Sequence, residues 1–282
     1  MFRRLHNRIR LILAGLVLAV AAPVLAQEQD VDRPSLALMG TIPIYWGEAD
    51  GLGELLDSSG QVHWARAQIE DTYRIEPLDY LSAEALAPFR YLLLAQPRAL
   101  SPEENVALDD WVRAGGSVLL FADPMMTGES RFALGDRRRP QDVALLSPIL
   151  QRWGLELEFD ESQQAGMTWA DFSGQPIPVN LPGRLRHLPE VDCHGHDWSG
   201  LAALCRVGAG HALIVADAAI LDFAGPHMHA RAGLRIILER IFAQNGENTG
   251  QLAESVAKIA EIDGISGDST PSSILPLARG SP

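Results

Sequence analysis

The sequence contains very little lysine, and its acidic residues outnumber its basic ones. Only one of the 23 basic residues is a lysine, Lys258, and 36 acidic residues give a formal net charge of −13. The first 26 residues hold four arginines and no acid, so the chain without them has 19 basic and 36 acidic residues and a charge of −17. Binding to nucleic-acid phosphates requires a basic face, so this balance argues against a nucleic-acid partner.

The motifs that would identify a nucleotide site or a nucleophilic enzyme are also missing. There is no complete P-loop, no Gly-x-Ser-x-Gly and no complete Gly-x-Gly-x-x-Gly. Gly51-Leu52-Gly53 lacks the third glycine, and Gly208-Ala209-Gly210 precedes a predicted strand, which indicates a turn. The segment Gln96-Pro97-Arg98, which follows an apolar run, holds neither serine nor cysteine. No cofactor and no catalytic residue is therefore predicted from motifs.

The first apolar run is too short for a membrane span. Met1–Arg10 is basic, and Leu11–Ala26 is apolar but shorter than the roughly 20 residues that cross a bilayer. Small residues precede Gln27 at Val24 and Ala26, which is typical of a secretory signal peptide cleaved after Ala26. The alternative is an uncleaved anchor. We expect residues 1–26 to be removed and the mature protein to be periplasmic, with no stable membrane span.

Cysteine is scarce, with only Cys193 and Cys205 in the chain. Both lie in the part that would be exported, and an even number of cysteines in an oxidising compartment favours one disulfide. The alternatives are two free thiols, or Cys193 acting as a metal ligand beside His194 and His196.

The remaining sequence alternates short apolar runs with amphipathic segments, which is typical of an α/β fold with an open, mostly parallel sheet and helices on both faces. A Ser-Pro-Glu-Glu start at 101 and Gly115-Gly116 delimit one helix clearly. Residues 27–245 are expected to form this domain, and 246–282 a flexible tail. The segment 36–46 is expected to begin as a buried strand and then reaches a glycine and a proline. Further strands are expected at 73–78, 91–95, 117–122, 155–159 and 211–216, and helices at 52–56, 82–88, 101–114, 145–153 and 230–242.

Two aspartates follow buried strands directly, Asp123 after 117–122 and Asp217 after 211–216. The carboxyl ends of parallel strands form the ligand crevice of open α/β sheets. We therefore predict a binding site there, with Tyr45 and Trp46 nearby and the arginine-rich loop 125–142, containing Arg137–Arg139, as a lid. The alternatives are that each aspartate caps the next turn and that the loop is only solvated. The predicted ligand-binding residues are Arg98, Asp123, Met125, Met126 and Asp217.

Histidines occur in two His-x-His pairs, His194/His196 and His227/His229. Two such pairs brought together would supply nitrogen ligands for zinc or copper. Their different settings, one between the cysteines and one before the last helix, favour surface histidines. No metal site is therefore predicted.

Three stretches together resemble a known family. Tyr91–Pro124 contains a strand, a Ser-Pro-Glu-Glu helix start, Gly-Gly and a strand ending in Asp-Pro. Leu146–Asp160 adds a helix, Trp-Gly and a strand, and Gly208–Asp222 adds Gly-x-Gly, a strand and Asp. This order resembles the exported auxiliary domain of uncharacterised ABC-type transport systems, related to gliding-motility ABC components.

The resemblance implies a flavodoxin-like fold similar to class I glutamine amidotransferases, without their Cys-His-Glu triad. It also implies an ABC transporter or another envelope protein as partner. The function expected is that of a non-enzymatic periplasmic domain that binds a ligand or a protein. The alternatives are a hydrolase that uses Asp123 and Asp217 as acid and base, and a metal-binding protein that uses the four paired histidines.

Overall fold

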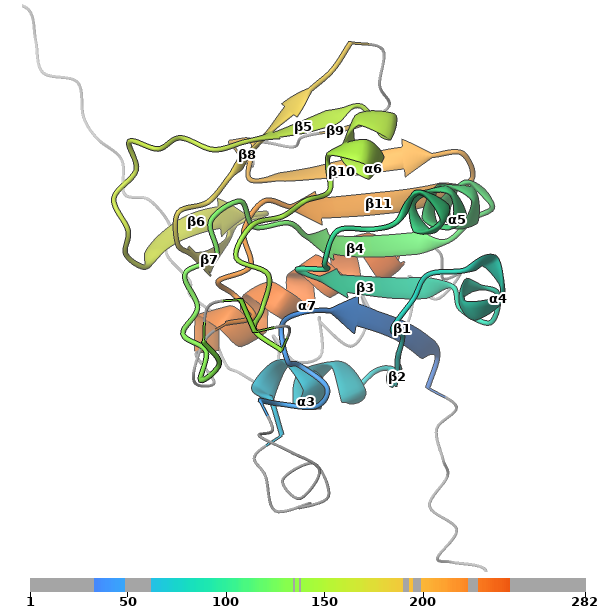
Figure 1. The fold of residues 1–282 in the computed structure, drawn as a ribbon, viewed down its shortest axis with the longest axis horizontal. Coiled ribbons are helices and arrows are strands. Elements are labelled where there is room, and N and C mark those ends of the chain that lie inside the picture. The colour runs from blue at the N-terminus through green and yellow to red at the C-terminus, as the bar shows by residue number, and fades with distance from the viewer. Residues whose placement is uncertain are drawn as a thin grey trace, which may run out of the picture.

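The computed structural model describes residues 33–48, 62–133, 135–136, 138–189, 193–194, 199–222 and 228–243. The predicted signal peptide, the helix expected at 52–56 and the predicted tail lie outside these residues. Within them the chain forms one large sheet, two small two-stranded sheets and helices (Figure 1).

The large sheet has seven strands in the order β2-β1-β3-β4-β11-β10-β9. The first five strands in this order run parallel, while β10 is antiparallel to both of its neighbours. The parallel part thus has the order 2-1-3-4-5 along the chain, which is one of the common orders of doubly wound sheets. The strands are β1 (Ser35–Gly40), β2 (Arg74–Pro77), β3 (Tyr91–Ala95), β4 (Ser117–Phe121), β9 (Cys193–His194), β10 (Ala202–Val207) and β11 (Gly210–Val215).

The three most apolar strands, β3, β4 and β11, lie side by side in the middle of the sheet, as their composition predicts. Their side chains alternate between two cores because successive residues of a strand point to opposite faces. Leu93 and Leu119 belong to one core, and Leu92 and Val118 belong to the other. Strands buried on both faces are typical of parallel sheets covered by helices.

Helices cover both faces, which confirms the predicted α/β class. On one face lie α3 (Trp64–Glu70) and α7 (Met228–Phe242). On the other face lie α4 (Ala83–Leu86), α5 (Pro102–Arg113) and α6 (Ser147–Arg152). Helix α5 begins with the capping box that its sequence predicts: the Ser101 side chain accepts from the Glu104 N–H, and the Glu104 carboxylate accepts from the Ser101 N–H.

The first strand ends at the glycine that interrupts its predicted run. It extends from Ser35 to Gly40, and a Cβ at Gly40 would lie 2.1 Å from the carbonyl oxygen of Ala95. Helix α3 was not expected at all. The region 166–192, expected to hold short strands and loops, contributes the hairpin β6 (Thr168–Phe172) and β7 (Gln175–Val179), and β8 (Arg184–His187), which pairs with β5 (Leu155–Glu158).

The predicted disulfide is confirmed. Cys193 of β9 and Cys205 of β10 are direct partners in the antiparallel register, their Cα atoms are 3.9 Å apart, and their sulfur atoms are bonded. The bond fixes the two-residue strand β9 at the edge of the sheet. Gly208 and Ala209 form the two-residue turn between β10 and β11, as predicted, with Gly208 at a φ of 62°.

Among the described residues, no helix combines the length and apolar character that crossing a membrane requires.

Candidate functional site

The carboxyl ends of β1, β3, β4 and β11 point to the same side of the molecule (Figure 1). The loop 125–142 and the β6–β7 hairpin also lie on this side. Hydrogen bonds join them to the sheet edge: the Asn180 N–H donates to Asp217, and its side-chain amide donates to Thr127 at 2.6 Å. This edge is therefore built from segments that are far apart in the sequence.

Asp123 and Asp217 follow adjacent parallel strands and lie on this edge, as the sequence predicts. Each has only 1% of its surface exposed. Asp123 accepts from the N–H groups of Met125 and Ala218 at 2.8 and 3.0 Å, and Asp217 accepts from those of Ala219 and Asn180 at 2.8 and 2.9 Å. Each carboxylate thus holds backbone turns together, in accordance with the capping alternative.

Burial is the largest cause of the pKa shifts of these two carboxyl groups. It raises the pKa of Asp123 to about 6, although the two backbone N–H donors favour the charged form. Burial and the negative charge of Asp123 raise the pKa of Asp217 well above its ordinary value. Asp222 is a third member of the cluster: burial, followed by the charges of Asp123, Glu48 and Glu129, raises its pKa to about 6.

The other predicted ligand residues have different surroundings. The Arg98 guanidinium forms two hydrogen bonds with the fully buried Glu104, at 2.7 and 2.9 Å, and donates to the carbonyl of Asp79. Met125 is 40% exposed, whereas Met126 is buried in the core under α3 and α7. Arg98 therefore links the start of α5 to the segment after β2 through hydrogen bonds.

Gln96 is a buried residue of this edge that the sequence analysis missed. It directly follows β3 in the left-handed region, with a φ of 49°, and is fully buried. Its side-chain amide donates to the carbonyls of Asp123 and Gln141, at 2.9 Å each, and its oxygen accepts from the Asp123 N–H. Its carbonyl accepts from Thr41. The only signal in the sequence was a polar residue before Pro97, directly after an apolar strand.

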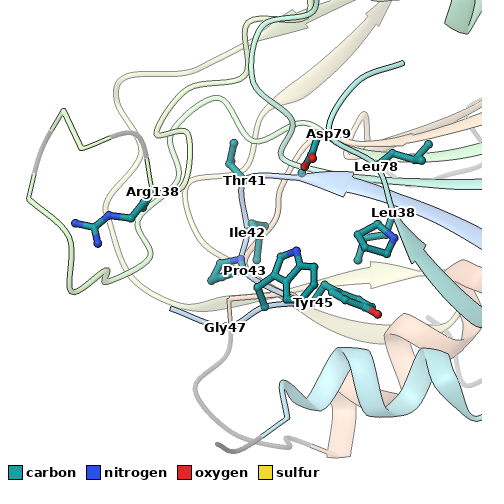
Figure 2. A pocket seen from close by; sticks show the side chains of 12 residues that line it. Leu38, Thr41, Ile42, Pro43, Tyr45, Gly47, Leu78, Asp79 and Arg138 are labelled. Atoms are coloured by element: carbon teal, nitrogen blue, oxygen red, sulfur yellow. The ribbon is translucent and has the colours of Figure 1, made fainter. Parts of the chain in front are cut away.

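A cavity of about 250 Å³ opens beside this network, at the carboxyl ends of β1 and β2. Three segments line it: the turn after β1, the segment after β2, and the loop that carries Arg138 (Figure 2). The lining residues are Leu38, Gly40, Thr41, Ile42, Pro43, Tyr45, Trp46, Gly47, Pro77, Leu78, Asp79 and Arg138. Tyr45, Trp46 and the arginine-rich loop were expected near the crevice, but none of the five predicted ligand-binding residues lines this cavity.

The turn after β1 brings two aromatic residues, Tyr45 and Trp46, to the cavity. Burial alternates from Thr41 to Ile44, with Ile42 and Ile44 in the core at 5% and 1% exposure, and it stops where the chain turns, so that Trp46 is 64% exposed. The turn closes with a hydrogen bond from the Gly47 N–H to the Pro43 carbonyl, and Gly47 has a φ of 68°, which favours glycine. The Arg66 guanidinium lies 4.2 Å from the centre of the Tyr45 ring and donates to the Tyr45 carbonyl.

The two members of the histidine pairs that the structure describes belong to different elements. His194 is in β9, and His229 is in α7 with its ring against Trp169. His196 and His227, as well as Arg137, lie outside the described residues. Among the side chains that the structure does describe, no group of three or more could hold a metal ion. The prediction that the four histidines do not form one site remains a prediction.

Comparison with known families gives a partial match. Residues 50–168 match the family model described as an ABC-type uncharacterized transport system. The match suggests an auxiliary component of such a system. The matched segment contains Asp79, Asp123 and Arg138, and it leaves Tyr45, Trp46 and Asp217 outside. No curated protein sequence matches the chain.

Solved structures show distant similarity. The mmIFT52 N-terminal domain is 10% identical, with 76% of this chain and 98% of that chain covered and a TM-score of 0.47. The exo-beta-1,4-mannosidase Op5Man5 from Opitutaceae bacterium strain TAV5 is 14% identical, with 84% of this chain covered and a TM-score of 0.41; the chain spans 37% of that enzyme. A cytoplasmic protein, STM1381, from Salmonella typhimurium LT2 is 11% identical, with 72% of this chain and 93% of that chain covered and a TM-score of 0.41. These values support no conclusion about function.

Proposed function

We propose that the mature chain is a non-enzymatic periplasmic domain that binds a component of an ABC-type transport or envelope system. The observation that carries this proposal is the cavity at the carboxyl ends of β1 and β2, because the carboxyl edge of the strands is the edge of open α/β sheets on which ligands bind. Four of its lining residues, Pro77, Leu78, Asp79 and Arg138, belong to the segment that matches the transport family.

Export is supported by the disulfide. Disulfides persist in oxidising compartments and are rare in the cytosol of mesophiles, and both cysteines of the chain are used in one. The basic and apolar sequence of residues 1–26 supplies the means of export. In this proposal cleavage after Ala26 leaves Gln27 as the N-terminus in the periplasm.

The amidotransferase-like part of the fold prediction remains an interpretation. The strand order 2-1-3-4-5 and the abrupt turn after β3 favour it. The residue at that turn is Gln96, whose side chain forms hydrogen bonds with two backbone carbonyls and one backbone N–H. The fold in this proposal thus provides a binding edge and not a nucleophile.

A binding function is preferred over the hydrolase alternative because Asp123 and Asp217 are buried and hydrogen-bonded to the backbone. A general acid and a general base must reach the bond that they act on. Asp123 and Asp217 are each 1% exposed, and each carboxylate accepts two backbone N–H groups. In the proposal the two carboxylates hold the backbone turns at the edge of the sheet, and the cavity binds the partner.

Co-purification from the envelope tests the proposed function. The tagged full-length chain, expressed in its own host, is isolated from detergent extracts, and its partners are identified by mass spectrometry. We expect a subunit of an ABC transporter to be enriched with the natural chain and with Trp169→Ala, which changes an exposed tryptophan of β6 away from the cavity lining. Trp46→Ala should reduce the enrichment at least five-fold. Equal recovery with both variants, or no transporter subunit at all, contradicts the proposal.

A further inference from the structure

The cavity is the size of one side chain. Pockets that hold drug-sized molecules measure about 300–1,000 Å³, whereas this one measures about 250 Å³. Its wall combines two aromatic residues, Tyr45 and Trp46, with two prolines, Pro43 and Pro77, and one carboxylate, Asp79. A single side chain presented by a partner protein matches this size better than a large free ligand does.

Three aromatic rings among the described residues receive a guanidinium group. Arg66 lies over Tyr45 at 4.2 Å, Arg138 over Phe132 at 4.1 Å and Arg231 over Trp64 at 5.9 Å, each measured to the ring centre. These contacts use the attraction between a cation and the negative face of a ring. Trp46 is 64% exposed, and its contact within the described residues is the Tyr45 ring, 4.7 Å away and nearly perpendicular. Trp46 therefore offers an indole face at the cavity without a cation on it.

The charges around the cavity favour a cation. The Arg138 guanidinium is balanced by Asp136, with hydrogen bonds of 3.1 and 2.8 Å to its two carboxylate oxygens. Asp79 is exposed, and its carboxylate accepts no hydrogen bond and forms no ion pair among the described residues. Arg98 interacts electrostatically with Asp79 and donates to its carbonyl, but its guanidinium makes its side-chain hydrogen bonds with Glu104. The cavity wall thus includes one carboxylate without a hydrogen-bond donor among the described residues, in a chain whose formal charge is −17 without its first 26 residues.

We propose that this cavity binds the guanidinium group of an arginine side chain on the partner protein, between the face of Trp46 and the carboxylate of Asp79. Arginine is preferred over lysine because its planar group stacks on an indole and can form two parallel hydrogen bonds with one carboxylate. This inference rests on the proposed function, since it names the group that the binding site recognises.

The test uses the purified mature chain, residues 27–282, and three blocked tripeptides, acetyl-Gly-X-Gly-amide, in which X is arginine, citrulline or glutamate. Citrulline keeps the shape of arginine and removes its charge. Binding is followed by NMR through the indole N–H signals, with the Trp46 signal assigned by its loss in Trp46→Ala. We expect millimolar binding of the arginine peptide, at least five-fold weaker binding of the citrulline peptide, and weakening of the arginine complex between 20 and 500 mM salt.

Variants assign the binding to the two residues. Trp46→Ala and Asp79→Asn should each weaken binding of the arginine peptide at least three-fold. The matched controls, Trp169→Ala and Asp71→Asn, change an exposed tryptophan and an exposed aspartate outside the cavity lining and should leave it unchanged. Equal affinity for arginine and citrulline, a preference for glutamate, or no binding overturns the inference. Such a result leaves the proposed function standing if a transporter subunit still co-purifies through Trp46, so the two failures are distinguishable.

Discussion

Three carboxyl groups at the sheet edge make the stability of the fold depend on pH. Asp123, Asp217 and Asp222 all have a raised pKa, with burial as the largest cause. A carboxyl group whose pKa is higher in the folded chain than in the unfolded chain binds more protons when folded. Its contribution therefore makes the protein most stable at low pH and less stable as the pH rises from about 4 to about 6.

Asp222→Asn tests this effect at one position. The Asp222 carboxylate forms no hydrogen bond among the described residues, so an amide there loses no partner. The variant should be about 1–2 kcal/mol more stable than the natural chain at pH 7.5, because it removes a charge whose pKa is raised to about 6. At pH 4, where the natural carboxyl is also largely protonated in the folded state, the difference should shrink towards zero. Urea unfolding at both pH values measures it; an equal difference at both would contradict the account.

Arg98 has a structural role in this account. Arg98→Ala leaves the fully buried Glu104 without its two guanidinium donors, which should destabilise the fold by about 2 kcal/mol. The matched control is Arg74→Ala, whose ion pair with Glu76 is exposed and should contribute less than about 1 kcal/mol. Thermal unfolding measures both changes. Unchanged stability of Arg98→Ala together with lost binding would return Arg98 to the ligand-binding role predicted from the sequence.

Strand β9 is the element that a disulfide joins to the sheet. It has two residues, and the disulfide to β10 joins positions 12 residues apart. Cross-links over loops of this length typically contribute about 2–3 kcal/mol.

Reduction of the disulfide tests that contribution. Dithiothreitol should lower the free energy of unfolding of the natural chain by about this amount and leave a Cys193→Ser, Cys205→Ala double variant unaffected. Differential scanning calorimetry with and without reductant measures the change. A natural chain that is insensitive to reductant, with reduction verified by thiol titration, would show that β9 contributes no stability.

The elements that the sequence predicts well are those with local signals. Strands β3, β4 and β11 are continuous apolar runs, and α5 has both its capping box and its terminal glycines in the sequence. Helix α3 was missed because its start lacks such a signal: its N-cap is His63, and its first turn has no acidic residue. The pairing of β5 with β8 was missed because it joins segments whose contact depends on the tertiary fold and not on local pattern.

At the scale of the whole molecule, the sequence predicts that Asp123 and Asp217 share one edge of the sheet, which the structure confirms, but it does not predict the cavity. Asp123 and Asp217 share that edge because their strands are parallel neighbours, which apolar composition could predict. The cavity depends on three further facts that no local pattern contains. These facts are the end of β1 at Gly40, the position of β2 beside β1, and the approach of the Arg138 loop through Gln96 and Thr41.

In the proposed function, the cavity beside Trp46 is the surface that binds the transport system. A photo-reactive benzoylphenylalanine residue at position 46 tests it most directly, with the same residue at position 169 as the control on another exposed surface. After irradiation of intact cells, we expect position 46 to yield a covalent product with an ABC transporter subunit and position 169 to yield none. A product with that subunit from position 169 alone, or from neither position while both proteins are exported and folded, would contradict it.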